Sequence, residues 1–380
     1  MLVRVNKLEA SSFAHEAKSS SSKGGDRMIE IDGSFGEGGG QVLRTTVALS
    51  ALLGKEIHVK NIRAKRPNPG LRAQHMTAIK AVAALSDAET SGLELGSSDL
   101  FFIPRRKTSG SFKFDVGTAG SISLVLQGLM PAAAFSSGGA EFEITGGTDV
   151  RWSPPIDYVR FVVLPILSRL GYVAQLKVLR RGHYPKGGGR VSMKVQPCKG
   201  LRPLLLTERS EIKEVHGISH SVKLPSHVAQ RQASAAEEIL KKTDHLNVFV
   251  KLETYPPASD PHIAPGSGIV LYTGEECGTV LGADSVGERG KPAEEVGRQA
   301  AKQLVEEIKS GAPVDRHMSD ILIPYLAVAE GRSEFRTSQI TMHTITNAKI
   351  AELVSGAEIR IDGELGNPGT VTVKGIGLRP

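Results

Sequence analysis

The stretch IDGSFGEGGGQVLR, residues 31–44, holds five glycines and carries a carboxylate, Glu37, in the middle of its glycine loop. Glycines let backbone N–H groups converge on an anion, and the helix predicted over 38–53 would add positive partial charge at its N-terminus. Glu37 would repel the same anion. A divalent cation between Glu37 and a phosphate would turn that repulsion into bridging, since Mg²⁺ is held by carboxylates together with phosphate oxygens. The alternative is that Glu37 points away from the loop. The stretch lacks the Gly-Lys-Ser/Thr ending of a P-loop.

A second candidate for chemistry is His343, in the sequence TMHTITN at the predicted start of a helix. An imidazole placed there, with cations nearby, suits nucleophilic attack on phosphorus. The alternative is a hydroxyl-rich helix cap with an incidental histidine. Asp320, three residues after His317, could steer an imidazole or coordinate a metal, or it could be an ordinary acid in the first turn of a helix.

Further polar side chains occupy the loops that precede or follow predicted helices. If similar units pack together, these loops can meet at one cleft. The side chains expected there are Gln41, Arg44, Arg63, Arg66, Gln74, His75 and Gln127.

The elements that would position these residues follow a repeated order, strand-helix-strand-helix-strand-strand. The first copy is predicted at 28–32, 38–53, 56–61, 70–86, 92–95 and 100–104. The second copy is predicted at 112–116, 119–135, 141–145, 155–170, 172–179 and 189–196. The third copy begins with a strand at 203–208 and resumes about a hundred residues later, at 317–329, 334–338, 343–354, 357–362 and 370–375.

The intervening segment has its own pattern of strands and helices. Its elements are predicted at 211–219, 226–242, 247–254, 268–273 and 291–310. We therefore expect an α/β protein (α+β layered) in which three βαβαββ repeats form a large domain, with a smaller α/β domain inserted in the third repeat. The expected boundaries are a disordered tail over 1–27, the large domain over 28–207 and 311–380, and the inserted domain over 208–310.

Composition narrows the class of partner. Lys plus Arg outnumber Asp plus Glu by 47 to 40, and the segment between Asp157 and Glu208 holds ten basic residues and no acid. A second acid-free basic tract lies between Lys60 and Lys80. Solvated faces are one explanation, but a nucleic-acid partner is favoured. No long apolar run or signal-peptide pattern occurs, and the two cysteines have no metal-ligand spacing, so we expect a soluble cytoplasmic protein without structural zinc or disulfides.

Six motifs taken together resemble the RNA 3'-terminal phosphate cyclases. They are DGSFGEGGGQVLR, IRAKRPNPGLRAQH, SLVLQ, GGTDVRWSPPIDY, GHYPKGGG and HTITN, and the resemblance covers essentially residues 28–380. That family is known for three βαβαββ repeats and an inserted smaller domain. The resemblance implies a ligase that forms phosphoric ester bonds, with ATP as co-substrate and Mg²⁺ or Mn²⁺ as metal.

The implied reaction has three steps. A histidine attacks the α-phosphate of ATP and releases pyrophosphate, AMP passes to the 3'-phosphate of RNA, and the 2'-hydroxyl displaces AMP to give a 2',3'-cyclic phosphate. By resemblance the nucleophile is His343 and the metal-associated acid is Glu37. The implied ATP-binding residues are Gln127, Pro154, Tyr158, His317, Met318, Ser319, Asp320 and Ile321. The positions implied around the phosphates and RNA are Gln41, Arg44, Arg63, Arg66, Gln74 and His75.

Two other functions compete with this one. A non-catalytic relative of the cyclases binds RNA in ribosome assembly, and loss of the histidine would mark that class. Enolpyruvyl transferases share the repeat architecture but act on small metabolites, and fold alone does not separate them. The partners expected are RNA with a 3'-terminal phosphate and ATP, with no membrane and no required protein partner.

Overall fold

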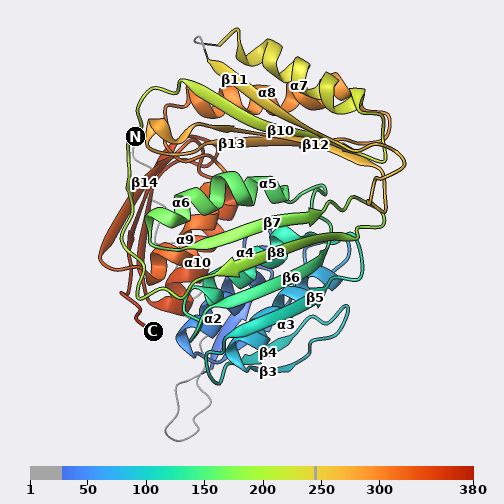
Figure 1. Ribbon diagram of the computed structural model, residues 1–380. Coiled ribbons are helices and arrows are strands. Elements are labelled where there is room, and N and C mark those ends of the chain that lie inside the picture. Colours follow the sequence, from blue (N-terminus) through green and yellow to red (C-terminus); the bar gives the residue numbers. More distant parts are fainter. Residues whose placement is uncertain (1–27, 244–245) are drawn as a thin grey trace, which may run out of the picture.

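The computed structural model describes residues 28–243 and 246–380 as a mixed α/β protein with four small sheets. The predicted disordered tail over 1–27 lies outside the described residues. In Figure 1, three sheets surround a group of helices, and the fourth lies beneath its own two helices at the top. Within the described residues, none of the helices has the length and apolar character needed to span a bilayer.

The first sheet has the order β1-β2-β4-β3, with one parallel pair and two antiparallel pairs. Its register places Ile31 opposite Val59, so that both side chains point into the core. The elements of this part are β1 (Ile29–Asp32), α2 (Gly40–Leu53), β2 (Ile57–Lys60), α3 (Ala73–Ser86), β3 (Glu89–Ser91) and β4 (Leu100–Ile103).

The second sheet repeats this arrangement in the order β5-β6-β8-β7, again with only the first pair parallel. The helical segment before β7 contains a π-helical turn, η1, between two short α-helices. The elements are β5 (Gly110–Asp115), α4 (Ile122–Ala133), β6 (Ala140–Gly146), α5 (Ile156–Tyr158), η1 (Val159–Val163), α6 (Leu164–Arg169), β7 (Ala174–Arg180) and β8 (Gly189–Val195).

The third sheet joins a strand from the middle of the chain to the C-terminal strands, in the order β15-β16-β14-β9. Its parallel pair is β9 with β14, so its strand order matches that of the first two sheets when read from β9. The elements are β9 (Leu205–Leu206), α9 (Met318–Val328), β14 (Arg332–Thr337), α10 (Met342–Ser355), β15 (Glu358–Gly363) and β16 (Gly369–Lys374).

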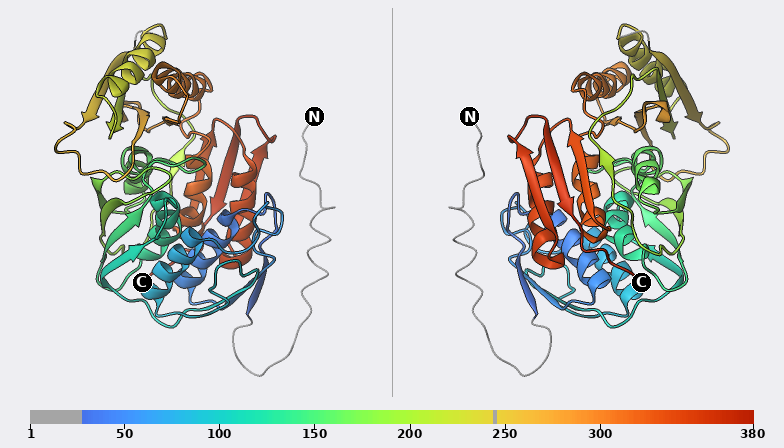
Figure 2. Two further views of the ribbon diagram at one scale, coloured as in Figure 1. Left: turned by 90° about the vertical axis from the view of Figure 1, so that its right-hand side faces the viewer. Right: turned by 90° about the vertical axis from the view of Figure 1, so that its left-hand side faces the viewer.

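Between β9 and α9 the chain builds the fourth sheet, in the different order β11-β10-β12-β13. Helices α7 and α8 pack together on one face of this sheet (Figures 1 and 2). The other face meets α5 and η1, where Tyr272 of β12 stacks on Phe161 of η1. The elements are β10 (Glu214–Val222), α7 (His227–Leu240), β11 (Asn247–Thr254), β12 (Gly266–Thr273), η2 (Glu275–Cys277), β13 (Gly282–Val286) and α8 (Ala293–Lys309).

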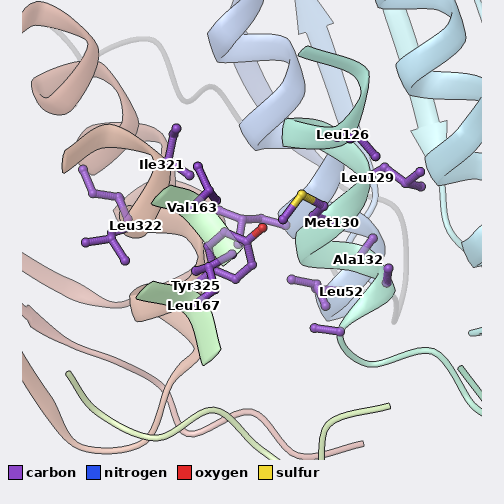
Figure 3. Close-up of a cluster of buried hydrophobic side chains, with 14 of the residues drawn as sticks. Leu52, Leu126, Leu129, Met130, Ala132, Val163, Leu167, Ile321, Leu322 and Tyr325 are labelled. Atoms are coloured by element: carbon purple, nitrogen blue, oxygen red, sulfur yellow. The ribbon is translucent and has the colours of Figure 1, made fainter. Parts of the chain in front are cut away.

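The main core forms where helices from the first three sheets meet. Helix α4 is apolar on nearly every side and is buried almost throughout, as expected for a helix inside a core. In Figure 3, Leu52 from α2, Met130 from α4, Val163 from η1 and Tyr325 from α9 lie around one centre. A separate, smaller apolar cluster lies between the fourth sheet and helices α7 and α8. Helices of different sheets therefore pack against one another in this core, and α2 contacts both α4 and α10.

One predicted strand is wrong, one predicted helix differs in its hydrogen bonding, and one strand was not predicted. Residues 92–95 form a turn, because Gly92 and Gly96 take left-handed backbone angles, and the polar segment Glu89–Ser91 pairs with β4 instead. The helix predicted over 155–170 is present over 156–169, with the π-helical turn η1 in its middle. Strand β13 was not predicted, since GADSV has no alternating pattern and is a strand only through its pairing with β12.

Candidate active site

The glycine loop between β1 and α2 lies against the N-terminus of α10. A side chain at Gly36, whose φ is +61°, would come within 2.3 Å of the Thr346 hydroxyl, and one at Gly40 would come within 2.2 Å of the His75 ring. At least two of the glycines are thus needed for close packing as well as for exposing backbone N–H groups. This packing brings Glu37 and Gln41 next to His343.

His343 is the second residue of α10, which the Thr341 side chain caps by accepting the Thr344 N–H at 3.1 Å. Its Nδ1 hydrogen-bonds to the Gln41 side-chain oxygen, and its Nε2 lies 3.7 Å from Glu37 Oε2. Because an amide oxygen only accepts, the network assigns the proton to Nδ1 and leaves a lone pair on Nε2. The side chain is 47% exposed, so Nε2 is accessible to a ligand.

Gln41 is itself held in place by two hydrogen bonds. Its Nε2 donates to Asp320 Oδ2 at 3.0 Å and to the backbone oxygen of His343 at 3.0 Å. These bonds orient the amide so that its oxygen faces the imidazole. Asn347 completes the arrangement by donating to the Asp320 backbone oxygen at 2.8 Å and accepting from Thr45 Oγ1 at 2.7 Å.

Electrostatics favours the neutral imidazole. Partial burial lowers the pKa of His343, and the guanidinium groups of Arg44 and Arg66 add to this effect, while Glu37 opposes it. Burial raises the pKa of Asp320 to about 7, with Arg44 acting in the opposite direction. A neutral His343 with Nε2 free is the form that can act as a nucleophile near neutral pH.

Cationic side chains line the same region. Arg66 Nη2 donates to Glu37 Oε2 at 3.2 Å, and Arg44 Nη2 donates to the Gln127 side-chain oxygen at 3.3 Å. Burial, together with the charges of Arg44, Arg63 and Arg72, lowers the pKa of His75 to about 3. His75 is therefore neutral, and its Nδ1 accepts the backbone N–H of Arg72 at 3.2 Å. The arrangement presents fixed positive charge beside the His343 imidazole and the Glu37 carboxylate.

Comparison with known proteins identifies the family. The family model described as RNA 3'-terminal phosphate cyclase matches residues 35–361. The chain belongs to this family. RNA 3'-terminal phosphate cyclases from Ignicoccus hospitalis and Hyperthermus butylicus are each 54% identical to it, and the alignments cover 92% and 93% of this chain and 99% of each relative. The protein of that name from Methanopyrus kandleri is 50% identical, over 91% of this chain and 99% of its own length. The resemblance inferred from the six motifs is thereby confirmed, and so is the expectation of an enzyme of the ligase class.

A solved structure, that of the enolpyruvyl transferase NikO from Streptomyces tendae, has a TM-score of 0.38 and 11% identity over 93% of this chain and 50% of the other. This similarity is too low to support an argument about fold or function.

The remaining residues implied by the cyclase resemblance lie in three settings. Within the segment 317–321, His317 is exposed, while Met318, Ser319 and Ile321 are buried, so their side chains face the core. Tyr158 is also fully buried, its hydroxyl donating to Asp315 Oδ1 at 2.7 Å and its ring edge against His317. Pro154 is half-buried, and its backbone oxygen accepts from Ser123. The ATP-binding role of these residues in the cyclase stays a prediction.

Two further implied residues make hydrogen bonds that hold loops in place. Arg63 Nη1 donates to the backbone oxygen of Gly70 at 3.0 Å, and the Gln74 side-chain oxygen accepts the Ser121 N–H at 3.1 Å. The basic tract between Asp157 and Glu208 is not wholly on the surface, since Arg181 is among the largest fully buried side chains. The expectation that this tract contacts RNA is wrong for Arg181.

The sequence analysis missed Asp315, which organises the start of α9. Its Oδ1 accepts the backbone N–H groups of His317 at 2.9 Å and Met318 at 2.8 Å, and its Oδ2 accepts the Gly282 N–H at 3.0 Å. An aspartate two or three residues before a helix is a recognisable capping signal. Its hydrogen bond with Gly282, the first residue of β13, connects the segment that carries His317 to the fourth sheet.

Proposed function

We propose that this member of the cyclase family converts an RNA 3'-terminal phosphate to a 2',3'-cyclic phosphate at the expense of ATP, with His343 as the nucleophile. The observation that carries the proposal is the pair of contacts on its ring: Nδ1 is fixed by Gln41, and Nε2 is accessible beside the glycine loop. The names of relatives about 50% identical over nearly the full length support the overall reaction.

In the first step Nε2 of His343 attacks the α-phosphorus of ATP, so that a P–N bond forms and the bond to pyrophosphate breaks. Arg44 and Arg66 balance the negative charge that develops on the phosphoryl oxygens. The Nδ1 proton stays in its bond to Gln41, which stabilises the charge that the ring acquires. The ligands that would occupy this site are ATP and the RNA end.

In the second step an oxygen of the RNA 3'-phosphate attacks the same phosphorus, and the P–N bond breaks to restore the imidazole. In the third step the 2'-hydroxyl loses its proton and attacks the 3'-phosphorus, and AMP leaves. The sum is ATP and a 3'-phosphate giving AMP, pyrophosphate and a 2',3'-cyclic phosphate. A ribose end is required because deoxyribose has no 2'-hydroxyl.

The residue that would hold a divalent ion is Glu37. It is exposed at the glycine loop, close to both His343 and Arg66, and one carboxylate plus phosphate oxygens is a common way to bind Mg²⁺. Mg²⁺ or Mn²⁺ bound there would supply neutralisation of phosphate charge.

Nucleotide recognition is assigned to the residues around this centre. We propose that Gln127 and the segment 317–321 contact ATP and that Pro154 borders the base. The ring of Tyr158, which packs edge-on against the ring of His317, would hold that side chain in position. Gln41, Arg44, Arg63, Arg66, Gln74 and His75 are the positions proposed around the phosphates and the RNA end. An RNA-binding role without catalysis is less favoured, because His343 is retained and sits in an oriented network.

We also propose that the first three sheets are copies of one βαβαββ unit and that 208–310 is a domain inserted in the third. The shared strand order of the three sheets, the different order of the fourth and its separate apolar cluster support this division. The same division gives 28–207 and 311–380 as the large domain.

The test of the proposed reaction uses a short RNA with a labelled 3'-phosphate, ATP and Mg²⁺ or Mn²⁺. The expected product carries label that resists phosphatase. An otherwise identical strand with a 2'-deoxy terminal nucleotide is the matched control: it can be adenylylated but not cyclised, so it should give only the AMP-bearing end, which a denaturing gel separates from the cyclic end. Absence of the cyclic product from the ribose strand, or a product of the same mobility from the deoxy strand, contradicts the proposed function.

A further inference from the structure

A second cluster of metal-ligating side chains lies at the contact between the second and fourth sheets. Asp149 follows β6, His183 follows β7, and His220 belongs to β10. One potential ligand atom from each lies within 4.8 Å of the others, and all three residues are at least 97% buried. Two sequence motifs quoted above, GGTDV and GHYPKGGG, contain Asp149 and His183, and the proposed reaction uses neither residue.

The two imidazoles lack the partners that buried ring nitrogens normally have. Among the described residues, His183 Nε2 and both nitrogens of His220 are buried without a hydrogen bond. His220 Nε2 lies 3.9 Å from Asp149 Oδ2, which is too far for a hydrogen bond. Unpaired buried polar groups cost about 1–3 kcal/mol each, so their presence calls for an explanation.

The backbone of β12 makes room for both rings. A side chain at Gly266 would come within 2.0 Å of His183, and one at Gly268 would come within 3.0 Å of His220. The ring centroids of His183 and His220 are 5.2 Å apart. Strand β12 thus packs closely against both imidazole rings.

The surrounding charges are unbalanced. Arg181 Nη2 contacts Asp157 at 2.6 Å and Glu253 at 2.7 Å, and its Nη1 lies 3.3 Å from Asp149. One guanidinium therefore faces three carboxylates. Thr148 Oγ1 donates to Asp149 Oδ2 at 2.6 Å and so orients the carboxylate. Hydrogen bonds of this kind commonly hold metal ligands in position. A divalent cation beside Asp149 would complete the charge balance.

We propose that Asp149, His183 and His220 bind one divalent transition-metal ion, Zn²⁺, that joins the second sheet to the fourth. Two imidazoles and a carboxylate are a common Zn²⁺ ligand set, with a fourth position for water. In a tetrahedral Zn²⁺ site, ligand atoms lie about 3.3 Å apart. The Asp149–His220 separation of 3.9 Å therefore needs to close by about 0.6 Å, and the pairs that include His183, which lie within 4.8 Å, by at most about 1.5 Å. The ion would hold the fourth sheet, and with it the Asp315–Gly282 contact, in position.

The test begins with tag-free full-length protein purified with Zn²⁺ present and dialysed, whose metal content is measured by mass spectrometry. The expected result is close to one Zn²⁺ per chain, with a lower melting temperature after removal by chelator and recovery when Zn²⁺ is returned. Cobalt added to the apoprotein should give the intense visible absorption of a tetrahedral site, and Zn²⁺ should abolish it.

Variants then locate the ion. His183→Ala combined with His220→Ala should lose the metal, and His227→Ala, which changes an exposed histidine of α7, should retain it. Glu37→Ala should also retain it, so that this site is tested independently of the proposed reaction. If the double variant fails to fold, as judged by circular dichroism, His220→Gln and the cobalt spectrum of the unaltered protein decide the question. Absence of stoichiometric Zn²⁺ uptake, a cobalt spectrum of octahedral type, or retention of the metal by the folded double variant overturns the proposal.

Discussion

The side chain of Gln41 links one acidic group, Asp320, to the proposed nucleophile. It donates to Asp320 and to the His343 backbone, and accepts from the His343 ring. The sequence analysis placed Gln41 among phosphate-binding residues. The structure gives it an additional role, which is to set the tautomer of His343.

Replacing Gln41 with Ala should reduce the rate of self-adenylylation about 100-fold, the order of effect seen when a reacting group is misplaced. The loss follows because neither the proton position nor the ring orientation would be fixed. Single-turnover measurements with labelled ATP provide the rate. Gln127→Ala is the comparison, expected to weaken ATP binding with less effect on the rate at saturating ATP. An unchanged rate in the Gln41 variant would remove Gln41 from the mechanism.

The pH dependence of self-adenylylation should reflect a His343 pKa below its usual value of about 6.5. The neutral ring reacts, so the rate should fall only as the pH drops below this depressed pKa. Arg66 lowers the pKa of His343, so Arg66→Gln should move the acidic limb of the profile to higher pH. The profile at saturating ATP measures the shift. A limb displaced to lower pH would show that the assigned electrostatics is wrong.

Helix α10 positions His343 through its first turn, and the cap at Thr341 defines where that turn begins. The sequence predicted a helix over 343–354, within a residue of the observed bounds at each end. The prediction succeeded because Thr341 is a capping residue at the start and Gly356 ends the helix in the left-handed conformation. Strand β13 and the π-helical turn escaped prediction because tertiary pairing and packing determine them.

Thr341→Ala should lower the free energy of unfolding by about 1 kcal/mol, the usual effect of losing a helix cap. It should also slow self-adenylylation, since His343 lies two residues away. Thr341→Ser keeps the hydroxyl and should behave like the unaltered protein. Chemical denaturation with both variants tests this, and equal stability of the Ala and Ser variants would contradict it.

The whole molecule brings together residues that are far apart in the chain. The motifs predicted the family, which the family model confirms. The structure brings Glu37 and Gln41 next to His343 and places Arg66 against Glu37. The buried Arg181 cluster could not be predicted, because its carboxylates come from β11, from α5 and from the loop after β6, and only the assembled fold shows that they converge. A basic residue in a basic tract gave no indication of burial.

The exposed part of the basic tract between Asp157 and Glu208 is expected to hold RNA. Reversing Lys186 and Arg190 together to Glu should weaken RNA binding and reduce its salt dependence, with the slope of log affinity against log salt falling by about 0.7 for each lost phosphate contact. Lys302→Glu, on the exposed face of α8, is the control. Fluorescence anisotropy at several salt concentrations measures both quantities. Unchanged affinity and slope in the double variant would exclude this surface from RNA binding.

The most direct test of the account is covalent labelling of the protein by ATP labelled at the α-phosphate, in Mg²⁺ or Mn²⁺, followed by a denaturing gel. The account predicts acid-labile label on the unaltered protein and on His227→Ala, and none on His343→Ala. Label retained by His343→Ala, or no label on the unaltered protein with either metal, in the presence or absence of 3'-phosphorylated RNA, would contradict the proposal that His343 is the nucleophile.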